Sequence, residues 1–323
     1  MPTETAPFLS DLLNADIDAT GVWLTCRDQV RIRVSLLRAE HARGTCIIFP
    51  GRTEYIEKYA TVMQIFQSHG LNVVTVDWRG QGLADRLLAD RTVGHIGTFD
   101  DYQRDVDAVM EWVAETGLEP PLYLLAHSMG GCIGLRRLIN HPTEFAGAIF
   151  SGPMWGIYFA PLLEPMVNSI TWIGEKLGLG NTYAPSTSSA AYALETSFED
   201  NKLTNDAALW DMMQRHLRAR PELIVSGPSW TWLRQARIEM AELAKLPSPP
   251  IPTYCFVGTD EEIVTKSDIL SRMKTWDHGM LDMVNKGRHE NLMEPRPAVE
   301  ALIAKALDHL GFDATGPSNR RAT

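Results

Sequence analysis

The chain has 323 residues, of which 45% are hydrophobic and 22% are charged, and this ordinary globular composition excludes a disordered or fibrous protein. Thirty basic residues stand against forty acidic ones, and the formal charge of −10 argues against a nucleic-acid partner. No apolar run approaches the roughly 18 residues that a membrane-spanning helix needs. The first twenty residues do not resemble a secretory signal, so we expect a cytoplasmic protein and leave open a peripheral association with the inner membrane surface.

The cysteines stand alone, each in or beside an apolar stretch, and none forms a C-x-x-C pair. They are Cys26, Cys46, Cys132 and Cys255. This spacing indicates neither a disulfide framework nor a zinc site, so we expect buried free thiols.

Short apolar runs alternate with longer helical patterns along most of the chain, which is typical of βαβ units and a mostly parallel sheet with helices on both faces. Strands are predicted at residues 30–37, 45–49, 71–76, 122–126, 146–150 and 253–257. Helices are predicted at residues 54–69, 99–115, 131–139 and 296–310. The first strand alternates polar and apolar residues and should be half exposed, while the others should be buried.

The alternation stops between about residues 153 and 246, where no strand is predicted. A run of small residues at 185–192 is typical of a loop, and the proline-rich segment 247–252 should return the chain to the sheet. We therefore expect an α/β core made of residues 1–152 and 247–323, with residues 153–246 inserted into it.

A candidate nucleophile lies directly after the predicted strand at 122–126. The segment Ala126-His127-Ser128-Met129-Gly130-Gly131 places Ser128 at a sharp turn between strand and helix, as in a G-x-S-x-G nucleophile elbow. Ala126 takes the position of the first glycine, which adds only one methyl group. A serine hydroxyl needs a base to act as a nucleophile, and the base needs a carboxylate to orient it.

The expected order on this fold is serine, acid, histidine. His289 follows a short apolar segment and precedes the last predicted helix, so it is the candidate base. Two carboxylates after the strand at 253–257 compete for the role of the acid. Counting from Gly258 in a G-x-x-D-x-x-V pattern favours Glu261, and Asp260 is the alternative.

An oxyanion hole requires two backbone N–H groups aimed at the developing negative charge. One is expected from Met129, directly after the nucleophile. The second is expected from Arg52, in the loop Phe49-Pro50-Gly51-Arg52-Thr53-Glu54. The side chains of Arg52 and Glu54 should form a structural ion pair at the start of the next helix, with contact to a polar head group as the alternative.

With these motifs the chain resembles the α/β-hydrolase superfamily, and more closely the bacterial lysophospholipase L2 and monoacylglycerol lipase group. The segment Asp77-Trp78-Arg79-Gly80-Gln81-Gly82 is similar to the D-x-R-G-x-G signature of that group. The resemblance implies that Asp77 and Arg79 hold loops together. It also implies that residues 153–246 form a helical cap over the active site.

Two apolar stripes in the insertion repeat at helical spacing: Leu162, Leu163, Met166, Ile170 and Ile173, then Leu209, Met212, Met213 and Leu217. We expect core contacts from them, with an apolar wall for the substrate as the alternative; the substrate-binding residues are otherwise left unassigned.

The resemblance implies a serine hydrolase that cleaves carboxylic esters of monoacylated lipids, lysophospholipid or monoacylglycerol, with no metal or organic cofactor. The alternatives are a carboxylesterase, a thioesterase or acyltransferase with the same triad, or an inactive binding protein on the same fold.

Overall fold

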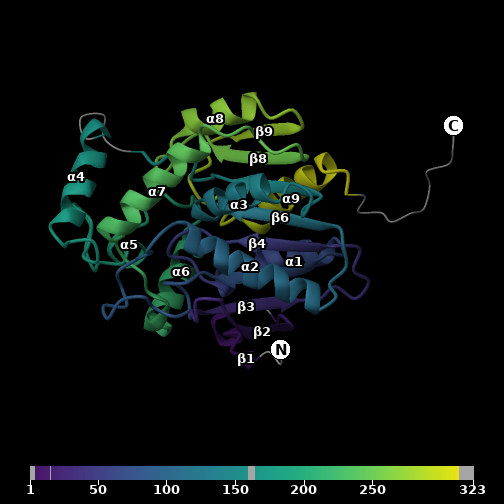
Figure 1. Ribbon diagram of the computed structural model, residues 1–323. Coiled ribbons are helices and arrows are strands. Elements are labelled where there is room, and N and C mark those ends of the chain that lie inside the picture. The colour runs from purple at the N-terminus through teal and green to yellow at the C-terminus, as the bar shows by residue number, and fades with distance from the viewer. Residues whose placement is uncertain (1–3, 15, 159–163, 313–323) are drawn as a thin grey trace.

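The computed structural model describes residues 4–14, 16–158 and 164–312, and these residues are built around one large sheet (Figure 1). Its nine strands lie in the order β1-β2-β3-β5-β4-β6-β7-β8-β9. The six strands β5, β4, β6, β7, β8 and β9 pair parallel with one another. The pairs β1–β2, β2–β3 and β3–β5 are antiparallel. The sheet is therefore mostly parallel, as predicted.

The strands are β1 (Glu4–Ala6), β2 (Ala19–Thr25), β3 (Arg31–Leu37), β4 (Thr45–Phe49), β5 (Asn72–Asp77), β6 (Leu122–His127), β7 (Gly147–Ser151), β8 (Thr253–Gly258) and β9 (Gly279–Val284). The α-helices are α1 (Ala60–Ser68), α2 (Asp100–Glu115), α3 (Met129–Asn140), α4 (Glu164–Lys176), α5 (Tyr192–Glu195), α6 (Ala207–Ala219), α7 (Trp230–Leu243), α8 (Lys266–Lys274) and α9 (Arg296–His309). Short 3-10 turns form η1 (Ser10–Leu12), η2 (Ile56–Tyr59) and η3 (Pro221–Leu223).

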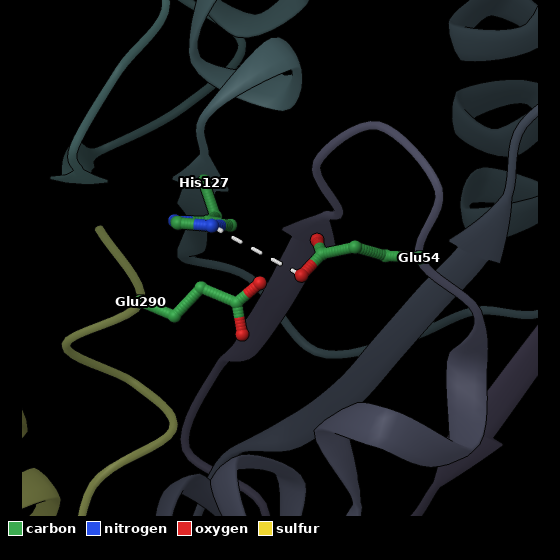
Figure 2. Close-up of side chains that lie close together, drawn as sticks. All are labelled: Glu54, His127 and Glu290. Carbon is green, nitrogen blue, oxygen red and sulfur yellow. Dashed lines mark ion pairs between the residues drawn. The ribbon is translucent and has the colours of Figure 1, made fainter. Parts of the chain in front are cut away.

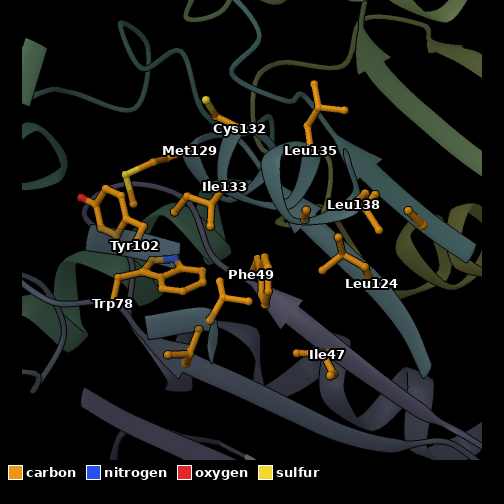
Figure 3. Close-up of a cluster of buried hydrophobic side chains, with 14 of the residues drawn as sticks. Ile47, Phe49, Trp78, Tyr102, Leu124, Met129, Cys132, Ile133, Leu135 and Leu138 are labelled. Carbon is orange, nitrogen blue, oxygen red and sulfur yellow. The ribbon is translucent and has the colours of Figure 1, made fainter. Parts of the chain in front are cut away.

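Helices cover both faces of the sheet because the buried strands are apolar on both sides. Ile47 and Ile48 are neighbours in β4, yet they belong to two different hydrophobic cores. The first core includes side chains of α2, α3 and α8, and the second includes side chains of α1 and α9. Figure 3 shows part of the first core, where Phe49 and Leu124 lie beneath Ile133 of α3.

All six predicted strands are present within about one residue, and the four predicted helices are present as α1, α2, α3 and α9. The predicted half exposure of β3 is wrong, because every residue from Ile32 to Leu37 is buried. Arg33 is buried because its charge is compensated by Asp77 and Glu57. The strands β1 and β2 and the helix α8 are not predicted from the sequence, and β9 corresponds to the short apolar segment before His289.

Between β7 and β8 the described residues contain the helices α4 to α7 and no named strand (Figure 1). Met213 and Leu217 of α6 are buried, as the second stripe predicted. In the first stripe, Met166 and Ile173 are exposed, so those predicted core contacts are wrong. Leu162 and Leu163 lie outside the described residues.

All four cysteines are free and buried, as predicted from their positions in apolar stretches. Across the described ranges, none of the helices has both the length and the apolar character that crossing a bilayer requires.

Candidate active site

Ser128 lies at the sharp turn between β6 and α3, as the elbow motif predicts. Its backbone has φ of 49° and ψ of −116°, a conformation that L-residues rarely adopt and that active sites often hold. The turn needs small neighbours, because a Cβ atom at Gly130 would collide with the carbonyl oxygen of Phe49. The backbone N–H of Ser128 donates to the carbonyl oxygen of Ser151, which fixes the turn against β7.

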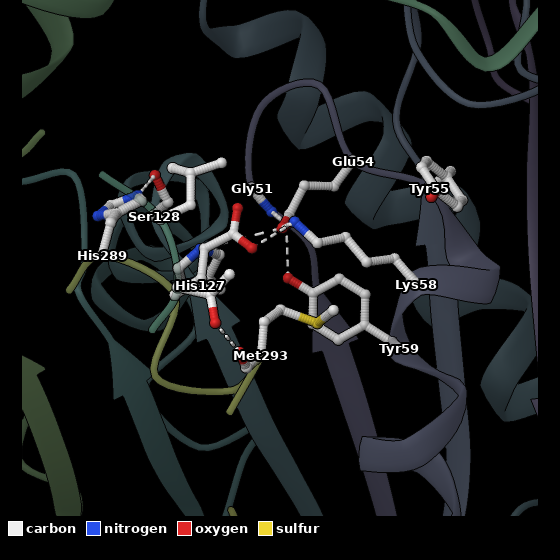
Figure 4. Close-up of polar contacts among 12 residues, drawn as sticks. Gly51, Glu54, Tyr55, Lys58, Tyr59, His127, Ser128, His289 and Met293 are labelled. Atoms are coloured by element: carbon white, nitrogen blue, oxygen red, sulfur yellow. Dashed lines mark hydrogen bonds and ion pairs between the residues drawn. The ribbon is translucent and has the colours of Figure 1, made fainter. Parts of the chain in front are cut away.

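The structure brings Ser128, His289 and Glu261 into one chain of hydrogen bonds. Nε2 of His289 lies 2.9 Å from Oγ of Ser128, as Figure 4 shows. On the other side of the ring, Nδ1 lies 2.8 Å from Oε2 of Glu261. All three side chains are buried. This arrangement has the geometry that a nucleophile, a base and an orienting acid require.

The geometry separates the two candidate acids. Oε1 of Glu261 accepts hydrogen bonds from the N–H groups of Ile263 at 2.6 Å and Val264 at 3.0 Å, so the carboxylate is fixed on both oxygens. Asp260 is exposed, and its side chain accepts a hydrogen bond from the hydroxyl of Thr259. Glu261 therefore lies against His289, whereas Asp260 points to solvent.

The pKa values of this pair move in opposite directions. Burial alone would raise the pKa of Glu261, but the charge and hydrogen bond of His289 and two backbone N–H groups lower it below its usual value. Burial alone would lower the pKa of His289, yet the charge and hydrogen bond of Glu261 raise it above 6.5. The pair therefore favours an imidazolium next to a carboxylate, the state that follows proton abstraction from a serine.

The predicted oxyanion loop lies against the elbow. The N–H of Gly51 donates to Oε2 of Glu54, and the N–H of Thr53 donates to the side chain of Gln81. Between them, the N–H of Arg52 has no acceptor among the described residues. Met129 is the first residue of α3, where a backbone N–H has no partner within the helix. Both predicted donors are thus free to bind a ligand.

A buried charged cluster holds this loop and was not predicted as a whole. Nζ of Lys58 lies 2.7 Å from Oε1 of Glu54 and 2.7 Å from Oε2 of Glu290. The hydroxyl of Tyr59 donates to Oε2 of Glu54 at 2.5 Å. Figure 4 shows how Gly51, Lys58 and Tyr59 converge on Glu54. In the sequence, only the spacing of four residues between Glu54 and Lys58, which is typical of an ion pair on a helix, indicates any part of this cluster.

His127 joins the edge of this cluster (Figure 2). Its Nε2 lies 4.0 Å from Oε1 of Glu54, and its Nδ1 contacts the carbonyl oxygen of Ser151 at 2.9 Å. Burial lowers the pKa of His127, so the ring is neutral at pH 7. Donor atoms of Glu54, His127 and Glu290 are close enough to hold a cation, but the ammonium group of Lys58 already bridges the two carboxylates.

Asp77 and Arg79 hold loops, as the resemblance implies. Asp77 accepts hydrogen bonds from the N–H groups of Ile56 and Leu83. Arg79 binds Asp105 and Asp28 through its guanidinium group. Neither residue lines the cavity at Ser128.

A cavity of about 610 Å³ opens at Ser128 and His289. The core contributes the loop from Gly51 to Tyr55, and the insertion contributes Trp232, Met213, Leu217 and the segment 185–188. The predicted ion pair between Arg52 and Glu54 is wrong. Glu54 pairs with Lys58 instead, and the guanidinium of Arg52 donates to the carbonyl oxygen of Ser226.

A mostly parallel sheet covered by helices on both faces, with the serine on a strained turn after a central strand, defines the α/β-hydrolase fold. Residues 40–296 match the family described as serine aminopeptidase, S33, and the chain belongs to this family.

Over 315 residues the chain is 27% identical to lysophospholipase L2 of Escherichia coli (strain K12), a match that covers 95% of this chain and 90% of the relative. A soluble variant of monoglyceride lipase from Saccharomyces cerevisiae has the same fold, with a TM-score of 0.70 and 16% identity over 94% of this chain and 99% of that one. A thermostable carboxyl esterase from Bacillus coagulans has a TM-score of 0.70 and 15% identity, over 90% of this chain and 100% of that one.

Proposed function

We propose that the protein is a serine hydrolase that cleaves carboxylic esters of monoacylated lipids through an acyl-enzyme. The observation that carries the proposal is the hydrogen-bonded chain of Ser128, His289 and Glu261, of which Ser128 and His289 line a cavity whose walls include many apolar side chains. The names of relatives that match most of the chain, a lysophospholipase and a monoglyceride lipase, support the lipid class.

In the proposed reaction, Oγ of Ser128 attacks the acyl carbonyl while Nε2 of His289 takes its proton. Glu261 fixes the tautomer of His289 and stabilises the imidazolium. The N–H groups of Arg52 and Met129 bind the oxyanion of the tetrahedral intermediate. The imidazolium then protonates the leaving alcohol, and His289 activates a water molecule that releases the fatty acid.

We further propose that residues 153–246 act as a cap over a core made of residues 1–152 and 247–323. Trp232, Leu233 and Met213 from this insertion line the cavity and give it an apolar wall. Such a wall suits an acyl chain, because burying a methylene group contributes about 0.8 kcal/mol.

We also propose a peripheral membrane association, which the exposed surface of α4 supports. Met166, Ile173 and Leu177 recur at helical spacing along α4 and its end, and they are 54%, 48% and 70% exposed. Trp172 beside them is half exposed. An apolar stripe of this kind, with an aromatic residue at its edge, is typical of a helix that lies on a lipid surface.

The buried carboxylates of the site do not favour an aminopeptidase. A peptidase of that kind must bind the α-ammonium group of its substrate with an acidic group. Glu54 and Glu290 are already paired with Lys58, which leaves the exposed Glu195 of the cavity wall for such a role.

The test is hydrolysis of a panel by wild type and Ser128→Ala: p-nitrophenyl esters of rising chain length, a monoacylglycerol, a lysophosphatidylcholine, an acyl thioester and an aminoacyl p-nitroanilide. We expect the two lipids to be the best substrates and Ser128→Ala to lose at least about 10⁴-fold in turnover. Ser35→Ala, which removes a buried hydroxyl with no partner in β3, is the matched control.

Other outcomes would assign the protein to a different class of activity. Cleavage of short esters alone would make it a carboxylesterase, and preference for the thioester would make it a thioesterase or acyltransferase. Cleavage of the anilide would make it a peptidase. No activity that depends on Ser128 would indicate a binding protein.

A further inference from the structure

Arg52 contributes two different groups to the cavity. Its backbone N–H is the proposed oxyanion donor, and its side chain forms part of the cavity wall. The guanidinium donates to the carbonyl oxygen of Ser226, and its Cζ lies 5.2 Å from the centroid of the Trp232 ring. These contacts hold the side chain in place but supply no negative charge.

The charge of Arg52 lacks a counter-ion. Of the described cations that line the cavity, Lys58 has two carboxylate partners, whereas Arg52 has none within ion-pair distance. Its Nε is sealed from solvent and has no hydrogen-bond partner. Burial lowers the pKa of Arg52 to about 10, so the group remains charged at neutral pH. A buried cation without a partner is costly, and an incoming anion would remove that cost.

The neighbouring wall supplies hydroxyl groups that suit a phosphate. Ser186 and Ser188 of the insertion line the same cavity. Ser226, whose carbonyl oxygen accepts a hydrogen bond from Arg52, donates its own hydroxyl to the carbonyl oxygen of Ser189, the residue after Ser188, at 2.8 Å. Hydroxyl groups beside a guanidinium are common partners of phosphate oxygens.

The length of the side chain also fits. About six covalent bonds separate the backbone nitrogen of an arginine from its Cζ, and about six separate the ester carbonyl carbon from the phosphorus of a 1-acyl lysophospholipid. The two spans are therefore similar in maximum length, as required if one residue is to bind the oxyanion with its backbone and the head group with its side chain.

We propose that the Arg52 guanidinium binds the phosphate of a glycerophospho head group, which makes lysophospholipids, rather than uncharged monoacylglycerols, the preferred substrates. This inference rests on the proposed function, because it assigns the leaving group of that same ester cleavage.

The test compares kcat/KM for 1-oleoyl lysophosphatidylethanolamine and 1-oleoylglycerol in the same mixed micelles. We expect wild type to prefer the lysophospholipid, and Arg52→Gln to lower the ratio of the two values by about 10- to 100-fold. Any damage to the oxyanion loop affects both substrates and cancels in the ratio. Arg52→Lys, which keeps a charge, should recover part of the ratio.

Arg86→Gln is the matched control. Arg86 is a half-buried arginine that also donates to carbonyl oxygens, those of Arg91 and Glu222, but it does not line the cavity. Its substitution should leave the ratio unchanged. A ratio that is the same in wild type and Arg52→Gln would overturn the proposal.

A second arm measures binding without lipid. Glycerophosphoethanolamine, inorganic phosphate and glycerol are tested as inhibitors of p-nitrophenyl butyrate hydrolysis. We expect competitive inhibition by the phosphodiester and at least a tenfold rise of its inhibition constant in Arg52→Gln. Inhibition by inorganic phosphate with no effect of the phosphodiester would overturn the head-group assignment in favour of a site for free phosphate.

The two proposals fail in different ways. If wild type cleaves p-nitrophenyl esters but neither lipid, the proposed function is wrong, and the inhibition arm alone decides the role of Arg52. If wild type cleaves both lipids with an unchanged ratio in Arg52→Gln, the function stands and the head-group inference is wrong.

Discussion

Glu261 uses both carboxylate oxygens, one for Nδ1 of His289 and one for the N–H groups of Ile263 and Val264. Glu261→Gln should lower kcat by about 10³- to 10⁴-fold, because an amide stabilises the wrong tautomer and leaves the imidazolium without its counter-charge. Steady-state kinetics on a p-nitrophenyl ester measure this. Asp260→Asn, one residue away and exposed, should change kcat by less than about threefold; a large loss there would assign the acid to Asp260.

The pH profile gives an independent test of the same pair. The base must be neutral, and Glu261 raises the pKa of His289 above 6.5, so kcat/KM should increase with pH through a value above 6.5. In Glu261→Gln the negative charge is gone, so the residual activity should increase at a lower pH than in wild type. An unchanged midpoint would mean that another group controls the profile.

The elbow motif and the order of the triad along the chain were enough to name Ser128 and His289 as candidates, and the structure places the two side chains within hydrogen-bond distance. The acid remained open, since Asp260 and Glu261 both follow β8 and only the turn that offers the N–H groups of Ile263 and Val264 distinguishes them. The position of Arg52 against Ser226 could not be predicted, because it depends on a contact between segments 174 residues apart.

Glu54 holds the proposed oxyanion loop through its contacts with Gly51, Lys58 and Tyr59. Glu54→Gln places an amide N–H₂ group opposite at least one of these donors. We therefore expect kcat to fall by roughly tenfold or more, with KM changed less, because a displaced loop weakens binding of the oxyanion more than binding of the substrate.

The measurement is the separate determination of kcat and KM for one ester. Glu239→Gln, which alters a buried carboxylate paired with Arg136 and distant from the loop, is the control. Equal losses in the two variants would show a general effect on stability rather than a role for the loop.

At the scale of a helix, α4 carries the proposed membrane surface. Ile173→Asp should reduce sedimentation with phosphatidylcholine vesicles by at least about tenfold, because a charge in the apolar stripe must be desolvated at the lipid surface. Met280→Asp changes an equally exposed apolar residue on β9 and should have no effect. A similar loss in both variants would contradict a specific role for α4.

Across the whole molecule, Arg33 ties β3 to its neighbours. Its fully buried guanidinium pairs with Glu57 at 2.8 Å and with Asp77 at 2.7 Å. Arg33→Leu leaves two buried carboxylates without a counter-charge, so we expect the free energy of unfolding to fall by about 3–5 kcal/mol. Urea denaturation measures this, with Arg27→Leu, from an exposed pair with Glu111, as the control that should keep the wild-type midpoint.

The strands differ in how well the sequence pattern predicts them. Buried parallel strands such as β4 are continuous apolar runs, so pattern alone finds them. Polar residues at Arg33 and Ser35 made β3 look half exposed, because pattern analysis assumes that a polar side chain faces water. β2 and β9 lie near the edges of the sheet, where burial is partial and the apolar pattern is correspondingly weak.

The ammonium group of Lys58 joins Glu54, beside the nucleophile elbow, to Glu290, the residue after the candidate base. The two carboxylates are encoded far apart, and the ribosome synthesises Glu54 and Ser128 long before His289 and Glu290. A nascent chain that ends before His289 has Ser128 without the candidate base, and it has Lys58 without its second carboxylate partner, Glu290. The proposed site is therefore complete only after His289 and Glu290 have been translated and have docked against the loop of Glu54.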